Sequence, residues 1–312
     1  MVLKEKSFPF QENENNNIEI ERSEENQEQE VDIYRKAREE ADVFLKNIEF
    51  IKKEEIIEVI PEEIKEETPV FVSPGWGVSL ELQKQSLKTI SLEGRIALTA
   101  CFEREEKIKE GEEGDIPIAE LQKALTIVSA LEKMGEGRFD AIGHSEGGLN
   151  LAIAASLYPE KFRNLVFISP AGMIGKDSYM DLIKRFAIDE GIKEFKNMEK
   201  SNIDSFYKYF KGILKYVFKN PLLAHKEIKE ISQMDIFKMT KYLKDRGVGV
   251  GFVCGADDKV FPIEEVIKNV NKQNLDHFIS TTGDHGAFIF DDKHILLATD
   301  LLKNMDKKDE QN

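Results

Sequence analysis

Short apolar runs alternate with amphipathic segments along most of the chain. The short runs are bounded by glycine, proline or polar residues, which is typical of strands, and the segments between them have apolar residues at helical spacing. The predicted strands cover residues 70–72, 95–102, 139–142, 165–168, 249–254 and 277–281, and the predicted helices cover residues 80–90, 116–134, 149–157 and 293–304. Strands that alternate with helices indicate an α/β fold with a mostly parallel central sheet and helices on both faces.

One long segment breaks this alternation. Residues 173–246 contain no convincing strand, are rich in aromatic side chains, and have more basic than acidic residues. This pattern predicts a helical cap inserted between two strands of the sheet, which leaves residues 69–172 and 247–312 as the core.

The N-terminal part has a different character. Residues 1–30 are rich in Glu, Asn and Gln, a composition that cannot bury enough apolar surface to fold, and they are expected to form a disordered acidic tail. Residues 31–68 are predicted to form an amphipathic helix, with Tyr34, Ala41 and Phe44 on its apolar face, followed by a short strand over residues 56–60 and a charged link over residues 61–67. This helix is expected to pack on the surface of its own domain; a dimer contact or a flap over the active site are the alternatives.

Composition and charge narrow the function classes. The chain has 312 residues and a formal net charge of −15, with 41% hydrophobic and 33% charged residues. The acidity is concentrated in the first 70 residues, and it disfavours non-specific binding of nucleic acid.

The start of the sequence has no signal-peptide pattern, and no run approaches the roughly 20 apolar residues of a membrane span, so a cytoplasmic location is expected. Cys101 and Cys254 lie in predicted strands and are expected to be free, buried thiols.

Candidate chemistry appears directly after the third predicted strand. Gly143-His144-Ser145-Glu146-Gly147 matches the pattern Gly-x-Ser-x-Gly, and a helix rich in small residues follows it. A serine on such a strand-to-helix turn has a strained backbone, lies at the positive end of the helix dipole, and needs small neighbours such as Gly143 and Gly147. An idle serine in a glycine-rich turn is the alternative interpretation.

Over about residues 69–305 the chain resembles the α/β-hydrolase fold family of esterases, lipases, peptidases and C–C hydrolases. The resemblance implies an acid after a later strand, and the pattern Gly-x-x-Asp-x-x-x-Pro at residues 255–262 selects Asp258, with Asp257 as the alternative. An Asx turn that caps the next helix is the structural alternative at this position. The resemblance also implies a histidine near the end of the chain. His285 fits because it lies in a glycine-flanked loop after the last predicted strand, whereas the side chain of His144 would point away from the serine.

The implied mechanism uses Ser145 as nucleophile, His285 as general base and Asp258 as the acid that orients the histidine. The implied oxyanion donors are the backbone N–H groups of Trp76 and Glu146, and neither a cofactor nor a metal ion is implied. The carboxylate of Glu146 is unfavourable beside an oxyanion hole unless it points away or is paired, and it could instead recognise a cationic or hydroxylated substrate group.

These features predict an enzyme that cleaves a carboxylic ester, either an esterase or a monoacylglycerol-lipase-like enzyme, with a small ester or acyl compound as substrate. A C–C hydrolase or an aminopeptidase could use the same triad, and a catalytically silent scaffold of the same fold is the alternative from another class. Lysines at helical spacing in the predicted cap are expected to form a solvated face, with contact to a lipid surface as a weaker alternative: Lys208, Lys211, Lys215 and Lys219. The sequence leaves the oligomeric state open.

Overall fold

A computed structural model describes residues 33–102, 107–108, 116–186, 203–273, 275, 277–286 and 292–309. The predicted acidic tail lies outside these residues. Apart from a helix over residues 33–47, the described elements in chain order are η1 (Lys53–Glu55), β1 (Ile56–Val59), β2 (Glu66–Ser73), α2 (Leu80–Leu92), β3 (Arg95–Ala100), α3 (Ile118–Met134), β4 (Phe139–His144), α4 (Glu146–Leu157), η2 (Pro159–Lys161), β5 (Phe162–Ile168), α5 (Tyr179–Ile183), α7 (Ile203–Lys219), α8 (Pro221–Ser232), α9 (Ile236–Lys244), β6 (Gly249–Gly255), α10 (Ile263–Gln273), β7 (Phe278–Thr281) and α12 (Asp292–Asp309).

The seven strands form one sheet in the order β1-β3-β2-β4-β5-β6-β7. Strand β1 pairs antiparallel with β3, and every other pair is parallel. The chain moves outward from β2 to β3 and then crosses back to place β4 on the other side of β2. The carboxyl ends of β2 and β4 therefore form the switch point at which sheets of this kind bind ligands.

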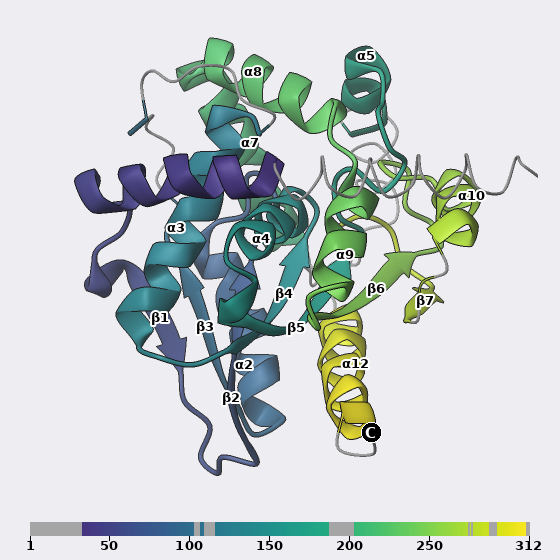
Figure 1. Cartoon of the computed structure of the whole chain (residues 1–312). Coiled ribbons are helices and arrows are strands. Elements are labelled where there is room, and N and C mark those ends of the chain that lie inside the picture. Colours follow the sequence, from purple (N-terminus) through teal and green to yellow (C-terminus); the bar gives the residue numbers. More distant parts are fainter. Residues whose placement is uncertain are drawn as a thin grey trace, which may run out of the picture.

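Side chains alternate between the two faces along each central strand, as the period of a strand requires. Phe71, Leu98 and Phe167 belong to one core cluster, while Val72 and Val166 belong to the other. Helices α3, α4 and α9 cover the first face, and α2 and α12 cover the second. The predicted arrangement of a mostly parallel sheet with helices on both faces is confirmed (Figure 1).

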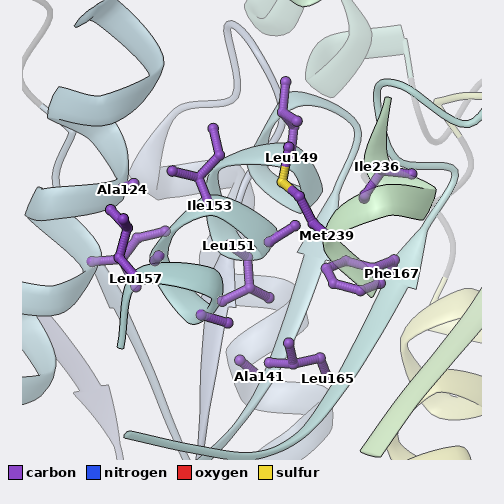
Figure 2. Packing of buried hydrophobic residues seen from close by; sticks show 14 of the residues in the cluster. Ala124, Ala141, Leu149, Leu151, Ile153, Leu157, Leu165, Phe167, Ile236 and Met239 are labelled. Atoms are coloured by element: carbon purple, nitrogen blue, oxygen red, sulfur yellow. The ribbon is translucent and has the colours of Figure 1, made fainter. Parts of the chain in front are cut away.

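Helix α4 is the central element of the first face. It is buried along its whole length, because small and aliphatic residues allow the sheet, α3 and α9 to approach it from three sides. Figure 2 shows Leu149 and Ile153 of α4 among side chains of these neighbours, including Ala124, Ile236 and Met239. Close packing on three sides leaves this helix little freedom to move, and its first residue follows Ser145.

The sheet begins earlier than the predicted core boundary at Pro69. Strand β1 matches the short strand expected over residues 56–60, and β2 already starts at Glu66. The first half of β2 was missed because its residues are polar and include Pro69, which has no N–H to donate. Its pairing with β3 is also irregular, since the register shifts between Glu66 and Val70.

The predicted cap range of residues 173–246 contains α5, α7, α8 and α9 among the described elements. Helix α9 packs against α4 and β6, and Phe237 lies in the core cluster, so this helix belongs to the core layer rather than to the cap. Figure 1 shows α5, α7 and α8, which we call the cap helices, beyond the end of the sheet toward which the parallel strands point.

The helix over residues 33–47 packs on its own domain. The ring of Tyr34 lies 4.4 Å from that of Tyr242 on α9, and Asp42 accepts a hydrogen bond of 2.7 Å from the hydroxyl of Tyr158. Arg38 pairs with Glu160 at 2.6 Å. Among the described residues, no helix has the length and apolar character needed to span a bilayer.

Candidate active site

Ser145 lies at the turn between β4 and α4, with backbone angles φ 53° and ψ −125°. This is a strained conformation for a residue with a side chain, and it persists only because the surrounding packing imposes it. The close approach of strand, turn and helix depends on glycine. A Cβ on Gly147 would lie 2.2 Å from the carbonyl oxygen of Pro74, and a Cβ on Gly143 would lie 2.6 Å from Cα of Gly148.

The loop after β2 packs directly on this turn. A Cβ on Gly75 would lie 3.1 Å from Cβ of Ser145, so the backbone of this loop touches the serine. Trp76 follows Gly75, and both Trp76 and Glu146 line the same cavity as Ser145. The two backbone N–H groups that the sequence predicted as oxyanion donors are thus on the two segments nearest the serine.

The structure brings Ser145, His285 and Asp258 together in a hydrogen-bonded chain. His285 Nε2 lies 2.9 Å from Ser145 Oγ, and His285 Nδ1 lies 2.9 Å from Asp258 Oδ2. Because a carboxylate can only accept, Nδ1 carries the proton and Nε2 of the neutral ring accepts from the serine hydroxyl. This tautomer is the one that a general base for Ser145 requires.

Asp258 is held from both sides. Its Oδ1 accepts backbone N–H groups from Val260 at 2.8 Å and Phe261 at 2.9 Å, which is the turn predicted as the structural alternative. The same carboxylate therefore caps a turn and orients His285. Asp258 is 3% exposed, whereas Asp257 is exposed on the surface, so of the two candidates Asp258 is the one that contacts His285.

His144 supports the loop that carries His285. Its Nε2 lies 3.0 Å from the backbone carbonyl oxygen of His285, to which it donates. Burial, together with the nearby His285, holds the pKa of His144 well below its ordinary value, so this ring remains neutral at physiological pH. A neutral His144 adds no positive charge next to His285, which must itself become charged if it accepts a proton.

An apolar cavity of about 350 Å³ opens onto Ser145. The cap helices and the loop after β6 supply most of its wall, with side chains that include Leu182, Phe186, Ile213, Ile228 and Val260. Tyr179 and His225 add a polar pair at this wall, with the tyrosine hydroxyl 2.6 Å from Nδ1 of the histidine. The cavity thus offers mainly apolar contact to whatever group reaches the serine.

A second cavity of about 640 Å³ lies behind Trp76 and Glu146, which also line it. Its wall is more polar and includes Lys123, Glu146 and Glu227. The carboxylate of Glu146 is paired there with Lys123 at 2.5 Å, which resolves how a charged residue can follow the serine.

Sequence reasoning missed Lys123 and Glu227. Lys123 occupies an ordinary position on an amphipathic helix, and Glu227 lies 104 residues further along the chain. The one available signal was the requirement that Glu146 needs a partner, and this requirement does not say which lysine supplies it.

Other candidates for chemistry play no part in this site. Both cysteines are free thiols, but Cys101 is only partly buried, contrary to the expectation from the sequence. Burial raises the pKa of Cys254 far above its ordinary value, which keeps it an unreactive thiol. Within the described ranges there is no group of three or more side chains of His, Cys, Asp or Glu that could hold a metal ion.

Comparisons with known proteins agree with this architecture. A family model described as alpha/beta hydrolase fold matches residues 102–189. No curated protein matches the sequence. Among solved structures, a carboxylesterase of Nitrososphaera gargenis superposes with a TM-score of 0.59 at 15% identity, covering 81% of this chain and 95% of that one.

Two further solved structures have the same architecture. A thermophilic esterase from Thermogutta terrifontis has a TM-score of 0.55 at 13% identity, over 80% of this chain and 93% of that one. The enol-lactonase from Burkholderia xenovorans LB400 also has a TM-score of 0.55 at 13% identity, over 80% and 96% of the two chains. The chain therefore has the α/β-hydrolase fold.

Proposed function

We propose that this protein is a serine hydrolase that cleaves a carboxylic ester through an acyl-enzyme. The observation that carries the proposal is the hydrogen-bonded chain from Ser145 through His285 to Asp258, which ends in an apolar cavity of about 350 Å³. A reactive serine, a base in the required tautomer and a buried carboxylate are the three parts that such catalysis needs.

In the proposed reaction, His285 takes the proton of Ser145 as the serine oxygen attacks the ester carbonyl. Asp258 stabilises the imidazolium that forms, and the backbone N–H groups of Trp76 and Glu146 donate to the tetrahedral oxyanion. The imidazolium then protonates the leaving alcohol, and water hydrolyses the acyl-enzyme with His285 again as base. Loss of one oxyanion donor would slow such a reaction by about 100- to 1000-fold.

The lining of the cavity supports an ester with an apolar acyl group over the substrate of an aminopeptidase. An aminopeptidase needs an accessible carboxylate for the amino group of its substrate. The carboxylate of Glu146 is engaged by Lys123 at 2.5 Å, and that of Glu227 by Lys123 at 2.9 Å. Burying a cationic amine against the remaining apolar wall would cost several kcal/mol, on the order of the penalty for an unpaired charge.

The test is labelling with a fluorophosphonate probe, together with hydrolysis of p-nitrophenyl esters of increasing acyl length. Wild type should label and Ser145→Ala should not, because the probe reacts only with an activated serine. For the ester series, kcat/KM should rise about fourfold for each CH₂ that enters the cavity, from roughly 0.8 kcal/mol per buried CH₂. Folded wild type that neither labels nor hydrolyses any ester would overturn the proposal in favour of a silent scaffold.

A further inference from the structure

A buried cluster of charges lies against the back of the candidate oxyanion hole. We call it the lysine cluster: Glu120, Lys123, Glu146 and Glu227. Lys123 Nζ lies 3.1 Å from Glu120 Oε1, 2.5 Å from Glu146 Oε1 and 2.9 Å from Glu227 Oε1. The three glutamates are at most 6% exposed, so one ammonium group is shared among three buried carboxyl groups.

Glu227 is the member of the lysine cluster that belongs to the cap. It lies on α8, and each of its two carboxylate oxygens is used. Oε1 binds Lys123, while Oε2 accepts the indole N–H of Trp76 at 2.9 Å and the hydroxyl of Tyr216 on α7 at 2.7 Å. Burial alone would raise the pKa of this carboxyl, but the charge of Lys123 and the two hydrogen bonds lower it. Glu227 therefore remains ionised and needs all three partners.

These contacts connect Glu227 to Trp76 and Glu146, the residues whose backbone N–H groups are the candidate oxyanion donors. Trp76 is bound to Glu227 directly through its indole ring, which also packs against the ring of Tyr216 at 5.6 Å. Glu146 is bound to Glu227 through Lys123. Trp76 and Glu146 line both the apolar and the polar cavity, so each has a side chain held by the lysine cluster and a backbone N–H on a segment beside Ser145.

We propose that Glu227 is a positioning residue that fixes the oxyanion hole and makes its geometry depend on the seating of cap helix α8. If α8 moves away from the core, the indole of Trp76 loses its hydrogen bond to Glu227, and Lys123 loses one of its three carboxyl partners, so both segments beside Ser145 lose part of their support. Each of these contacts joins α8 to the core or to the neighbouring cap helix, so the seated helix and the assembled hole stabilise each other. This inference rests on the proposed function.

The central test is the variant Glu227→Gln. It keeps the size of the side chain and an oxygen that can accept from Trp76, but it removes the charge that holds Lys123. We expect kcat for a p-nitrophenyl ester to fall about 10- to 100-fold, less than the loss of a whole donor, with KM changed by no more than about threefold. Binding of a trifluoromethyl ketone, which forms an oxyanion on Ser145, should weaken by the same factor as kcat/KM.

The matched control is Glu230→Gln, which makes the same change of charge on the same helix, away from the wall formed by Trp76 and Glu146. It should keep kcat and inhibitor binding within about twofold of wild type. A loss of general stability would affect both variants through the fraction of folded protein, which titration of the active site with the fluorophosphonate probe measures. After correction for the fraction of active protein, a loss of stability leaves kcat and inhibitor affinity unchanged, whereas a positioning role lowers both.

A second variant, Trp76→Phe, keeps the proposal testable if Glu227→Gln does not fold. It removes the indole N–H that donates to Glu227, together with the five-membered part of the indole, and it keeps an aromatic ring and the backbone donor; we expect a decrease of kcat of about 5- to 10-fold. If wild type is an active esterase but both variants keep its kcat and inhibitor affinity, the positioning role is excluded. An inactive wild type would instead count against the proposed function itself.

Discussion

Two buried charge clusters lie at opposite ends of the sheet and differ in composition and support. At the amino ends of the strands, Asp140 on β4 pairs with Arg95 of β3 at 2.5 Å and with Arg163 of β5 at 2.7 Å; we call this the arginine cluster. All of its members are on strands of the sheet, with β2 between β3 and β4, and its two cations outnumber this carboxylate. At the carboxyl ends, the lysine cluster has three carboxyl groups for one cation, and none of its members is on a strand.

The difference in composition and position indicates whether each cluster contributes to stability or to catalysis. The arginine cluster joins three strands that cannot move relative to one another, so its charges contribute only to stability. The lysine cluster joins α3 and α4 of the core to α8 of the cap, and it touches the two segments beside Ser145. Changes at the carboxyl ends should therefore alter catalysis, and changes at the amino ends should alter only the free energy of unfolding.

The largest effect is expected at the carboxyl end, for Asp258→Asn. An asparagine in place of Asp258 would favour the wrong tautomer of His285 and lose the charge that stabilises the imidazolium, so kcat should fall by about 10⁴-fold. Asp257→Asn is the matched control, because this exposed neighbour keeps its backbone hydrogen bond to Gly283. Steady-state hydrolysis of a p-nitrophenyl ester measures both. Equal losses in the two variants would show that the assignment of the acid is wrong.

At the amino end, Asp140→Asn should lower the stability of the fold and leave catalysis nearly unchanged. Asp140 is fully buried and accepts from Arg95, Arg163 and the backbone N–H of Asn164, so the change leaves charged groups without their partner. The free energy of unfolding should decrease by about 3–5 kcal/mol, as measured in urea, while kcat per active site stays within about twofold.

Glu66→Gln is the milder comparison for the arginine cluster. Glu66 is a partly exposed partner of Arg163 at 3.4 Å, and its loss should cost about 1 kcal/mol or less. A large decrease of kcat per active site in Asp140→Asn would contradict the division between the two ends of the sheet.

The residues of the candidate triad could be predicted because each one lies in a local pattern. Ser145 follows an apolar strand and lies between glycines, Asp258 has a glycine before it and Pro262 after it, and His285 is in a glycine-flanked loop. In each case neighbouring residues in the sequence determine the backbone, and the backbone determines where the side chain points. The alternation of strands and helices fixed the fold class for the same reason.

The lysine cluster could not be predicted, because its members come from three helices that meet only in the folded chain. Lys123 and Glu227 have the spacing of ordinary solvated residues, and only tertiary packing buries them. Helix α9 was assigned to the cap for a related reason, since its aromatic residues fit a cap and a core layer equally well. The start of β2 was missed because Pro69 and the glutamates before it do not resemble a strand.

The charge imbalance of the lysine cluster is tested most directly by the pH dependence of stability in Glu120→Gln. Burial raises the pKa of Glu120 to about 8 from an ordinary value of 4.5, although Lys123 opposes this shift. Between these values the folded protein keeps a proton that the unfolded chain releases. The contribution of this group to stability is therefore complete below about pH 4.5 and is lost as the pH rises toward 8.

Glutamine has no such proton, so Glu120→Gln should become steadily more stable relative to wild type between about pH 5 and about pH 8. Glu93→Gln is a control of opposite sign, because the hydrogen bond and charge of Lys303 lower the pKa of Glu93. The ionised carboxylate of Glu93 stabilises the fold above its ordinary pKa, and this contribution disappears only on acidification. The free energy of unfolding of Glu93→Gln should therefore differ from that of wild type by a constant amount between about pH 5 and about pH 8. Urea unfolding at several pH values measures both differences. A constant difference for Glu120→Gln would mean that Glu120 is ionised in the folded protein and that Lys123 balances more charge than we infer.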